Sequence, residues 1–400
     1  MVASKDKTLQ GANVLATGLK GVPQLLPAAA VYGANASGKS NLIKALQYMR
    51  GVVVDSAAMA PNQTFAVQPF RLHREFLNEP TEFEISFILD KTRYQYGFAL
   101  TSRRITSEYL LVYRSFKPQR WFSRSFDEKS GKDIYEFSAS LKGFKNLWEK
   151  ATRSNSLFLS MAAYLNSEAL QPVFDWFANQ LIVFNEFAAP NPDLTVQMLE
   201  DADNRKNICN FLASADISIA DIEVETRMVP GGRFRVDFLT GKAESQSEES
   251  EQKLLRFHHI TKEGSAIFDL IDESSGTRNL LFLLGPIFKT LQKGLTLVID
   301  ELDVSLHPLL VAELISLFHN RKANQNKAQL IFTSHNTSFL NVPQLLRRDQ
   351  VWFVEKGQNQ ASVLTGLQEF SPRKHEAIER GYLMGRYGAI PLFDRTTVAY

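Results

Sequence analysis

Short apolar runs separated by amphipathic stretches mark both ends of the chain. The run over 28–32 precedes a stretch with helical spacing over 41–46, and in the last third the runs over 295–299 and 329–333 are separated by helical spacing over 309–319. Strands that are apolar throughout and alternate with helices are typical of parallel sheets covered on both faces. This pattern predicts an α/β fold with a mixed, largely parallel sheet.

The residues after the first helix follow a different period. Apolar and polar residues alternate over 82–89, and returning strands are expected over 94–100 and 108–113. From 138 to 215 the period becomes helical. These patterns predict an antiparallel β subdomain followed by a helical insertion. Four aromatic residues of that insertion are expected in its core: Trp148, Phe158, Trp176 and Phe177.

A second β-rich region is expected between the helical insertion and the last third of the chain. The turn residues Pro-Gly-Gly at 230–232 predict a hairpin within 222–239. The stretch 241–253 has alanine as its only apolar residue and predicts a mobile loop. A further hairpin is expected to join 254–260 to 266–271.

Composition narrows the class of protein. Hydrophobic residues make up 44% of the 400 residues and aromatic residues 11%, which is enough for a sizeable core and excludes a disordered chain. The net charge of +2 neither requires nor excludes a nucleic-acid partner. The single cysteine, Cys209, excludes an internal disulfide and a cysteine-based zinc site and suits a reducing compartment. No apolar run reaches the length of a membrane span and residues 1–7 are polar, so we expect a soluble, cytoplasmic protein without a membrane partner.

The segment 33–40 matches the pattern G-x-x-x-x-G-K-[ST] between an expected strand and an expected helix. Glycines let the backbone close around an anion with successive N–H groups pointing inward, and the helix N-terminus adds a partial positive charge. Lys39 is therefore expected to contact the β- and γ-phosphates of a nucleotide, and the Ser40 hydroxyl to bind Mg²⁺. The expected nucleotide-binding residues are Gly33, Asn35, Ser37, Gly38, Lys39, Ser40 and Asn41.

Two strands of the last third end in polar residues. The strand over 295–299 is followed by Asp300 and Glu301, and the strand over 329–333 by His335. Ligands bind at the carboxyl ends of strands in open α/β sheets, and these two strand ends are expected side by side. We expect Asp300 to hold Mg²⁺, directly or through water, Glu301 to polarise the attacking water, and His335 to contact the γ-phosphate or that water.

A helix is also expected over 277–291, and the residues Ser-Ser-Gly-Thr-Arg at 274–278 form its beginning. Ser275 is expected to cap this helix, whose free N–H groups can bind an anion. Because the loop 33–40 already surrounds one face of the nucleotide, we expect this second anion site to serve the nucleotide of a second subunit.

Four segments, in the order GANASGKSN, ESSGTR, TLVIDELDVSLHP and IFTSHN, resemble the ABC-type ATPase heads of the SMC/RecF/OLD-like class, and the similarity covers most of the chain. The chain looks most like the stand-alone AAA-family ATPases of prokaryotic defence and abortive-infection loci. This resemblance implies a P-loop NTPase fold of the ABC-ATPase head type, with ATP and Mg²⁺ as ligands. It also implies a head-to-tail homodimer, or a higher homo-oligomer, with two ATP molecules between subunits.

The resemblance assigns roles to individual residues of the nucleotide site. Lys39 and Ser40 match the Walker A motif, and Asp300 and Glu301 match the Walker B motif. His335 matches the switch histidine of the family.

Other residues match motifs that the family uses around this site. Ser275, Gly276 and Arg278 match the signature segment, which in the family reaches the γ-phosphate bound by the partner subunit. Asp303 matches the D-loop acid, and Gln68 matches the glutamine that senses Mg²⁺.

The sequence also departs from that family. Thr277 stands in the signature where many relatives have glycine, and the chain begins later than those relatives do, so we expect either a start further upstream or a sheet without one edge strand. It has no long coiled coil of the SMC kind and no Toprim-like acidic cluster after His335, so an OLD-type nuclease is not expected within it. We divide the chain into an N-terminal ATPase lobe (1–137), a helical and β-hairpin insertion (138–264) and a C-terminal ATPase lobe (265–400).

Together these features predict Mg²⁺-dependent ATP hydrolysis in a head-to-tail dimer that acts as a conformational switch. By resemblance, the switch senses an invader in antiphage defence and controls a separate effector protein, expected to be a nuclease. The alternative is a RecF/SMC-like DNA-binding ATPase of DNA repair or maintenance, with phosphate contacts from the arginine pairs 103–104 and 347–348. A transporter ATPase is disfavoured because it needs membrane partners, and a P-loop kinase because it needs neither the signature segment nor His335.

Overall fold

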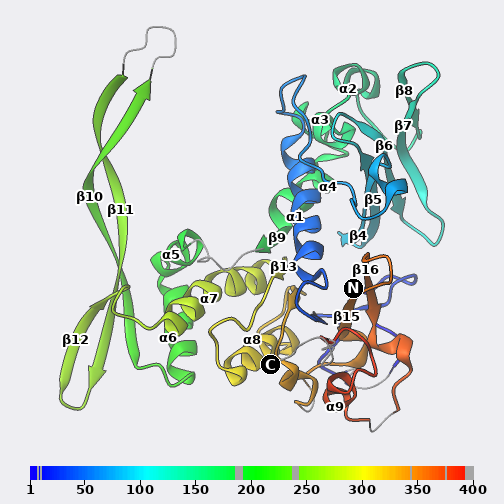
Figure 1. The fold of residues 1–400 in the computed structure, drawn as a ribbon. Helices are drawn as coiled ribbons and strands as arrows, with labels where there is room; N and C mark the ends of the chain where they lie inside the picture. The colour runs from blue at the N-terminus through cyan, green and yellow to red at the C-terminus, as the bar shows by residue number, and fades with distance from the viewer. Residues whose placement is uncertain are drawn as a thin grey trace, which may run out of the picture. The chain divides into compact units, whose positions relative to one another are not determined.

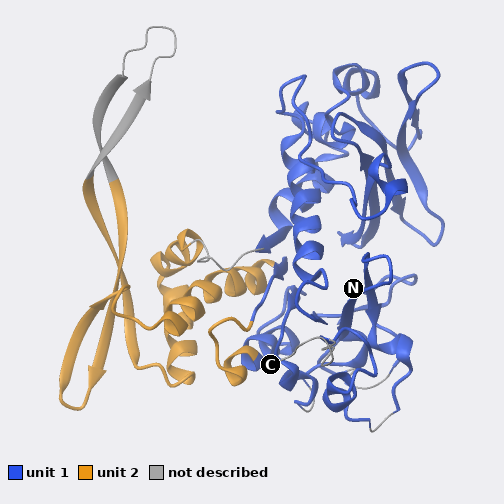
Figure 2. Cartoon of the chain, in the orientation of Figure 1, with its two compact units in different colours: residues 1–185, 294–302, 312–400 blue, residues 186–293, 303–311 orange. Residues whose placement is uncertain are grey.

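The computed structural model describes residues 1–400 except 7, 8, 10, 185–191, 237–242, 343–344, 374–375 and 392–400, and for 230–236 and 243–250 it describes the backbone only. The chain divides into two compact units, coloured separately in Figure 2. Unit 1 comprises Met1–Asn185, Gly294–Leu302 and Ala312–Tyr400, and unit 2 comprises Glu186–Lys293 and Asp303–Val311. The units interleave along the chain, whereas the three segments expected from the sequence are each continuous. In the described part of the chain, no helix is both long enough and apolar enough to cross a membrane.

Among the described residues, the central sheet of unit 1 has six strands in the order β16-β15-β3-β14-β13-β9 (Figure 1). These strands are β3 (Ala28–Gly33), β9 (Leu181–Phe184), β13 (Thr296–Ile299), β14 (Gln329–Thr333), β15 (Val351–Lys356) and β16 (Ser362–Gly366). All neighbouring strands are parallel except β15 and β16. The expected mixed, largely parallel sheet is therefore confirmed, and all six residues of its inner strand β3 are buried.

Three strands of this sheet go beyond the sequence prediction. β9 lies within 138–215, which was expected to be helical throughout; with four residues it is too short to show a period of its own. β15 and β16 form a hairpin near the C-terminus, and β16 is the edge strand with three exposed residues at its start. An exposed edge strand needs no continuous apolar run, so its sequence gives little signal.

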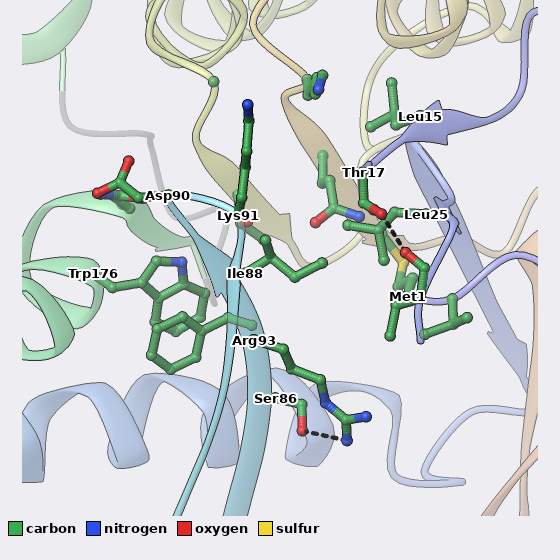
Figure 3. Close-up of a pocket in the computed structure, with 18 of the residues that line it drawn as sticks. Met1, Leu15, Thr17, Leu25, Ser86, Ile88, Asp90, Lys91, Arg93 and Trp176 are labelled. Carbon is green, nitrogen blue, oxygen red and sulfur yellow. Dashed lines mark hydrogen bonds between the residues drawn. The ribbon is translucent and has the colours of Figure 1, made fainter. Parts of the chain in front are cut away.

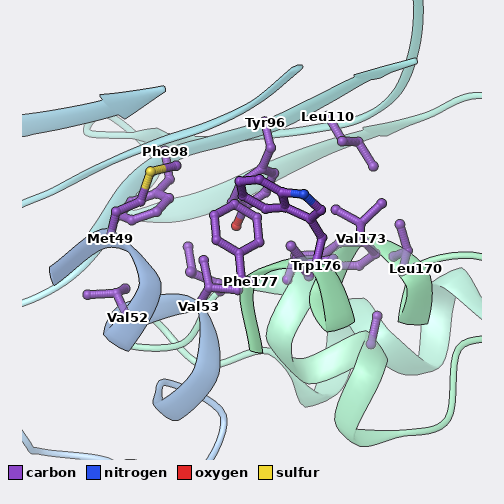
Figure 4. Packing of buried hydrophobic residues seen from close by; sticks show 14 of the residues in the cluster. Met49, Val52, Val53, Tyr96, Phe98, Leu110, Leu170, Val173, Trp176 and Phe177 are labelled. Atoms are coloured by element: carbon purple, nitrogen blue, oxygen red, sulfur yellow. The ribbon is translucent and has the colours of Figure 1, made fainter. Parts of the chain in front are cut away.

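The helix α1 (Lys39–Asp55) follows β3 directly and is longer than the predicted stretch 41–46. Its residues Met49 and Val53 lie in one hydrophobic cluster with Phe98 and Phe177 (Figure 4). The four aromatic residues expected in the core are all buried in this cluster: Trp148, Phe158, Trp176 and Phe177. The helix that begins at the glycine loop is therefore anchored in the main core of unit 1.

The antiparallel subdomain of unit 1 is a five-stranded meander in the order β4-β5-β6-β7-β8. Its strands are β4 (Thr81–Leu89), β5 (Thr92–Leu100), β6 (Ile105–Tyr113), β7 (Gln119–Asp127) and β8 (Lys132–Phe137). The first three confirm the predicted strands, and the last two extend the sheet. Asp90 and Lys91, between β4 and β5, have positive φ values of 47° and 58°, the geometry of a two-residue turn that matches the twist of a hairpin.

Short helices and a small two-stranded sheet complete unit 1. They are β1 (Leu15–Ala16), β2 (Gln24–Leu25), η1 (Arg74–Leu77), α2 (Lys145–Ala151), α3 (Phe158–Tyr164), α4 (Gln171–Asp175), η2 (Trp176–Gln180), η3 (Thr337–Leu340), η4 (Arg348–Gln350), η5 (Leu367–Phe370) and α9 (Ile378–Leu383). Helix α8 (Pro308–His319) begins in the part of the chain assigned to unit 2 and continues in unit 1. The ring of Tyr382 on α9 stacks on Phe353 of β15 with centroids 5.1 Å apart, so the last described helix packs on the central sheet.

A buried charged residue joins the meander to the helices of unit 1. The Glu108 carboxylate on β6 accepts hydrogen bonds from the backbone N–H groups of Phe158 and Leu159, at 2.6 and 2.9 Å. The Tyr96 hydroxyl donates to the same carboxylate at 2.9 Å, and Arg124 Nη1 lies 3.9 Å from it. Burial raises the pKa of Glu108, while the Arg124 charge and the two N–H donors oppose that rise. The carboxylate thus satisfies the first N–H groups of α3, which a helix leaves without partners of its own.

In its described residues, unit 2 contains three complete helices and a three-stranded antiparallel sheet in the order β10-β11-β12. Its elements are α5 (Asp193–Glu200), α6 (Ala202–Ser214), β10 (Ile219–Val236), β11 (Ala243–Thr261), β12 (Gly264–Asp269) and α7 (Ser275–Lys293). β10 and β11 form the long two-stranded ribbon seen in Figure 1. The pairing of β11 with β12 confirms the hairpin predicted over 254–271.

Two predictions for the ribbon are wrong. The expected turn at 230–232 lies inside β10, where Pro230 pairs with Glu249, and the expected loop is part of β11 from Ala243 onward. Residues 241–242 of the expected loop and residues 237–239 of the expected hairpin lie outside the described residues. Because β10 is an edge strand, a proline without an N–H group is tolerated in it. A two-stranded ribbon also buries little surface, so its strands need no alternation of apolar residues.

Helix α7 carries Pro286 in its interior, which cannot donate to the Phe282 carbonyl one turn earlier. The hydroxyl of Thr195 on α5 donates to that carbonyl instead, at 3.1 Å. Gly285 permits this approach, because a methyl group there would lie 2.6 Å from Thr195 Cα. The helix therefore continues through the proline as far as Lys293.

Candidate nucleotide-binding site

A cavity of about 500 Å³ in unit 1 brings together most of the predicted site. It lies at the loop between β3 and α1 and at the carboxyl ends of β13 and β14. Its lining residues are Asn35, Ala36, Ser37, Gly38, Lys39, Ser40, Asn41, Glu301 and His335. The predicted nucleotide-binding residues are all among them except Gly33, and so are both residues predicted to act on the attacking water.

The glycines of the loop are required by close approach of the backbone. A methyl group at Gly33 would lie 2.5 Å from Ser37 Oγ and 2.5 Å from the backbone oxygen of Val354 on β15. Gly38 has a φ of 113°, in the region that favours glycine, and it directly precedes α1. Ser362 Oγ on β16 donates to the backbone oxygen of Ser37 at 2.6 Å, so the edge strand braces the loop.

Lys39 and Ser37 show what the loop can bind. The Lys39 side chain is 5% exposed, and its Nζ donates to the backbone oxygens of Gly33 and Ala34 at 2.8 and 3.2 Å. The hydroxyl of Ser37 is buried and has no hydrogen-bond partner among the described residues. A buried ammonium, an unsatisfied hydroxyl and the first N–H groups of α1 converge on one loop, which is the donor set that a phosphate group requires.

The two acids after β13 occupy different environments. Asp300 is buried, and Thr333 Oγ1 donates to its Oδ1 at 2.5 Å. Glu301 has a φ of 53°, and its half-exposed side chain lines the cavity. The N–H group of Glu301 donates to Thr333 Oγ1 at 2.7 Å, so one hydroxyl is bonded to both acids. Asp300 is not a lining residue of the cavity.

Thr333 is a residue of the candidate site that the sequence analysis did not identify. β13 and β14 are parallel, and Ile299 pairs with Phe332 in their register. The residues that follow this pair, Asp300 and Thr333, therefore also lie side by side. The sequence did offer one signal for this residue: Thr333 ends the strand that was expected beside the strand carrying Asp300 and Glu301.

His335 lies at the mouth of the same cavity. Its Nε2 is 3.8 Å from Glu301 Oε1, and the side chains of His335 and Glu301 are 41% and 44% exposed. An exposed pair at this distance contributes little to stability. What matters for the site is the position of the pair, because the imidazole of His335 and the carboxylate of Glu301 line the same cavity at the loop.

The other predicted residues are not brought to this cavity. Gln68 is exposed and is not among the lining residues. The signature residues 275–278 and Asp303 belong to unit 2. There, a methyl group at Gly276 would lie 3.1 Å from the backbone oxygen of Ser305, so the signature packs close to the segment that follows Asp303. The Oδ1 atom of Asp303 is buried without a hydrogen-bond partner among the described residues.

The predicted cap of α7 is wrong by one residue. Ser274 Oγ, not Ser275 Oγ, accepts the hydrogen bond from the Thr277 N–H group, at 3.0 Å. Ser274 therefore occupies the N-cap position, and Ser275 is the first residue of α7, with an exposed side chain. The helix does not use the Ser275 hydroxyl as its cap.

The arginine pairs considered for DNA contact are mostly bonded within the protein. Arg104 Nη2 donates to Asp133 at 2.7 Å, and Arg347 is buried in a two-pronged contact with Asp349 at 2.8 and 2.7 Å. Arg348 donates to the backbone oxygens of 372 and 373. These three guanidinium groups are therefore committed to internal contacts.

The residues of the site fit Mg²⁺ bound together with a nucleotide. Within the described residues, no group of three or more His, Cys, Asp or Glu side chains is arranged to hold a metal ion. Mg²⁺ at a phosphate loop does not need such a group, because substrate phosphates and water supply most of its ligands and the protein adds one or two oxygens. The Ser40 hydroxyl lines the cavity and is an oxygen of this kind. The buried Asp300 carboxylate does not line the cavity and would hold the ion through water.

A second cavity, also of about 500 Å³, lies at the amino ends of β13 and β14, where Thr296 and Gln329 line it. Figure 3 shows Trp176 on one side of this cavity and Lys91 of the β4–β5 turn near it. None of the predicted site residues is among its lining residues. Ligands of open α/β sheets bind at the carboxyl ends of the strands, so the loop cavity is the better candidate for the nucleotide.

Comparison with known proteins identifies the family of the chain. Three of the solved structures that resemble the chain are SMC heads. One is an Smc head bound to the C-winged helix domain of ScpA (13% identity, 87% of this chain and 93% of that chain, TM-score 0.37). Another is the SMC head domain from Thermotoga maritima (13%, 86% and 92%, 0.36). The third is an Smc head domain with an extended coiled coil bound to the C-terminal domain of ScpA derived from Pyrococcus furiosus (11%, 87% and 92%, 0.37). These TM-scores are below 0.5, so the assignment rests on the family model and on the sheet. No curated protein matches the chain with significance. A family model described as "AAA domain, putative AbiEii toxin, Type IV TA system" matches residues 28–341, well over half of the chain. The chain therefore belongs to this AAA family, and its fold is the α/β fold of a P-loop NTPase.

Proposed function

We propose that this protein hydrolyses ATP with the help of Mg²⁺ at the cavity above the β3–α1 loop. One observation carries the proposal: the loop residues 35–41 line a single cavity together with Glu301 and His335. A phosphate-binding loop, a carboxylate and an imidazole around one space are the parts that phosphoryl transfer to water requires.

In this proposal each residue has one task. The N–H groups of the loop and the Lys39 ammonium bind the β- and γ-phosphates, and Ser40 and Asp300 hold Mg²⁺. When bound, the ion neutralises the charge that develops on the phosphates. Glu301 accepts a hydrogen bond from the attacking water and orients it towards the γ-phosphorus, and His335 holds the opposite side of that water or the γ-phosphate.

We further propose that the active form is a head-to-tail homodimer, or a higher homo-oligomer built from it. Ser275, Gly276 and Arg278 of one subunit would complete the site of the other, with Asp303 beside them. The support is that Ser275 stands exposed at the first position of α7, while Ser274 takes the capping role. The first turn of α7 thus keeps both a hydroxyl and N–H groups available for a phosphate.

For the biological role, we propose a conformational switch in antiphage defence that senses an invader and controls a separate effector, expected to be a nuclease. The description of the family as an AbiEii-like toxin of a type IV toxin–antitoxin system supports this reading. The alternative, a DNA-binding ATPase of repair or maintenance, has less support, because Arg104, Arg347 and Arg348 are bonded internally.

The test is the substitution Glu301→Gln. We expect phosphate release to fall by about 10²- to 10⁴-fold, the usual contribution of a general base. Size-exclusion chromatography with ATP should show a dimer that persists for this variant. Glu313→Gln, at an exposed position of α8, is the matched control and should hydrolyse ATP normally. Normal turnover by Glu301→Gln, or wild-type protein that neither binds nor hydrolyses ATP, would contradict the proposal.

A further inference from the structure

A histidine–glutamate pair with a partly buried imidazole and a buried carboxylate lies next to the signature segment in unit 2. His259 Nε2 is 2.7 Å from Glu273 Oε1, and the two side chains are only 19% and 7% exposed. His259 is on β11, close to its end at Thr261, and Glu273 lies two residues before Ser275 (275 − 273 = 2). The pair therefore connects the ribbon strand to the start of α7.

The chain between β12 and α7 has few other points of attachment. Of its five residues, 270–274, Glu273 is the one that is buried. Asp272 makes only a local turn with Asp269, through hydrogen bonds of 3.0 Å in each direction. Ser274 caps α7 and so moves with the helix. The position of this connection relative to the sheet is thus set mainly by the bond of Glu273 to β11.

The histidine is itself held in place by the sheet. Its ring lies against the ring of Phe268 on β12, with centroids 4.6 Å apart and planes at 35°. His259 pairs with Ala266 in the register, so Phe268 is its diagonal neighbour on the same face of the sheet. Because the ring plane of His259 is held by this contact, its Nε2 atom points to the Glu273 carboxylate in one direction.

We propose that His259 and Glu273 are positioning residues that fix Ser275 relative to β11, so that hydrolysis depends on this pair although neither residue touches the nucleotide. The inference rests on the proposed function, in which Ser275 acts on the γ-phosphate bound by a second subunit. A displacement of about 1 Å in a group that contacts the reacting atoms can lower a rate by about 100-fold. Loss of the pair should therefore lower kcat, while the loop of unit 1 still binds ATP.

The chain contains a matched control one residue away. His258 Nε2 lies 3.4 Å from Glu223 Oε2, with side chains 33% and 60% exposed. Both pairs join a histidine of β11 to a glutamate. His258 and His259 nevertheless point to opposite faces of the sheet, because successive residues of a strand do so. An exposed pair of this kind contributes little, so its removal should not affect hydrolysis.

The experiment measures ATP hydrolysis and the affinity for a fluorescent ATP analogue in single and double variants. We expect His259→Ala and Glu273→Ala each to lower kcat by about 10- to 100-fold with an unchanged Kd. The double variant should be no worse than either single variant, because the two residues act as one unit. Glu273→Gln keeps an oxygen that can accept from Nε2–H and should retain kcat within about threefold of wild type. His258→Ala should behave as wild type.

Three results would overturn the inference: wild-type kcat in His259→Ala, losses of the two single variants that multiply in the double, or a fall in nucleotide affinity that matches the fall in kcat. If the alanine variants do not fold, His259→Gln and Glu273→Gln replace them, and equal kcat in the two would count against the pair. A failure of the proposed function is recognised separately. In that case Ser275→Ala keeps full hydrolysis, or the wild type has none, whatever the pair does.

Discussion

Replacing Thr333 by valine removes a single hydroxyl that is bonded to both acids of the candidate site. Thr333 Oγ1 donates to Asp300 at 2.5 Å and accepts from the Glu301 N–H group at 2.7 Å, and the side chain is fully buried. Valine has nearly the same shape, so packing is preserved while both polar groups lose a partner. A hydrogen bond to a charged group contributes about 1.5–3 kcal/mol and a neutral one about 0.5–1.5 kcal/mol, so the free energy of unfolding should fall by about 2–4.5 kcal/mol.

The effect on turnover follows from the charged bond. The hydrogen bond from Thr333 to Asp300 holds the acids in position, so its loss should raise the activation free energy of hydrolysis by about 1.5–3 kcal/mol. This corresponds to a kcat lower by about 10- to 150-fold. The assay is phosphate release at saturating ATP, together with titration of a fluorescent ATP analogue. The Kd of the analogue should stay within about threefold of wild type, because the bonds of Lys39 to the loop are unchanged by the substitution.

The control is Thr333→Ser, which keeps the hydroxyl and loses only a methyl group. We expect its kcat to remain within about threefold of the wild-type value, since both hydrogen bonds can still form. Hydrolysis of ATP at the wild-type rate by Thr333→Val would contradict this prediction. Equal impairment of the serine and valine variants would also contradict it, because the hydroxyl would then not be the cause.

Two further predictions use glycine packing and pH. Gly33→Ala should abolish binding of the ATP analogue, because the new methyl group would lie 2.5 Å from the backbone oxygen of Val354, which cannot move without distorting β15. Gly11→Ala, where no atom lies within 4 Å, should bind the analogue normally, and tight binding by Gly33→Ala would refute the close approach. Burial lowers the pKa of His319 to about 4 from its ordinary 6.5, and its Nε2 faces the side-chain amide of Gln350 at 3.0 Å. The pKa of His319 is lower in the folded state than in the unfolded state, so the neutral imidazole favours folding. Its contribution to the free energy of unfolding is complete above pH 6.5 and is lost as the pH falls towards 4. Between pH 7 and pH 5 the loss is about 2 kcal/mol. Thermal unfolding at both pH values should show a smaller decrease for His319→Gln than for wild type, and equal decreases would argue against a buried neutral imidazole.

The parts of the fold that bury a continuous apolar surface were predictable from the sequence. β3, β13 and β14 are rich in apolar residues and lie inside the sheet, and their pattern indicates both their existence and their parallel order. The loop 33–40 could be found because its glycines permit a backbone geometry that few other residues adopt and its lysine bonds to the loop backbone. The positions of Glu301 and His335 at one cavity then followed from which strand ends are neighbours.

Features without such a surface were not predictable. The ribbon of β10 and β11 is held by backbone pairing along its length, so its Pro-Gly-Gly and glutamate-rich stretches carry no apolar period. Thr333 was missed because its role depends on the register between two strands rather than on its own sequence motif. The contact of His259 with Glu273 crosses from a strand to a connection fourteen residues later (273 − 259 = 14), and no local pattern marks it.

The strand order has a consequence for how the protein is made. β3 forms its sheet with partners that follow it by about 300 residues, since Ala29 pairs with Ile331 (331 − 29 = 302). Ribosomes add about 5–20 residues per second, so these partners emerge roughly 15–60 s after β3 has left the tunnel. During that interval an apolar strand with two unpaired edges waits in the nascent chain, where it can pair with other chains. We therefore expect newly synthesised copies to be most prone to wrong strand pairing until translation is nearly complete.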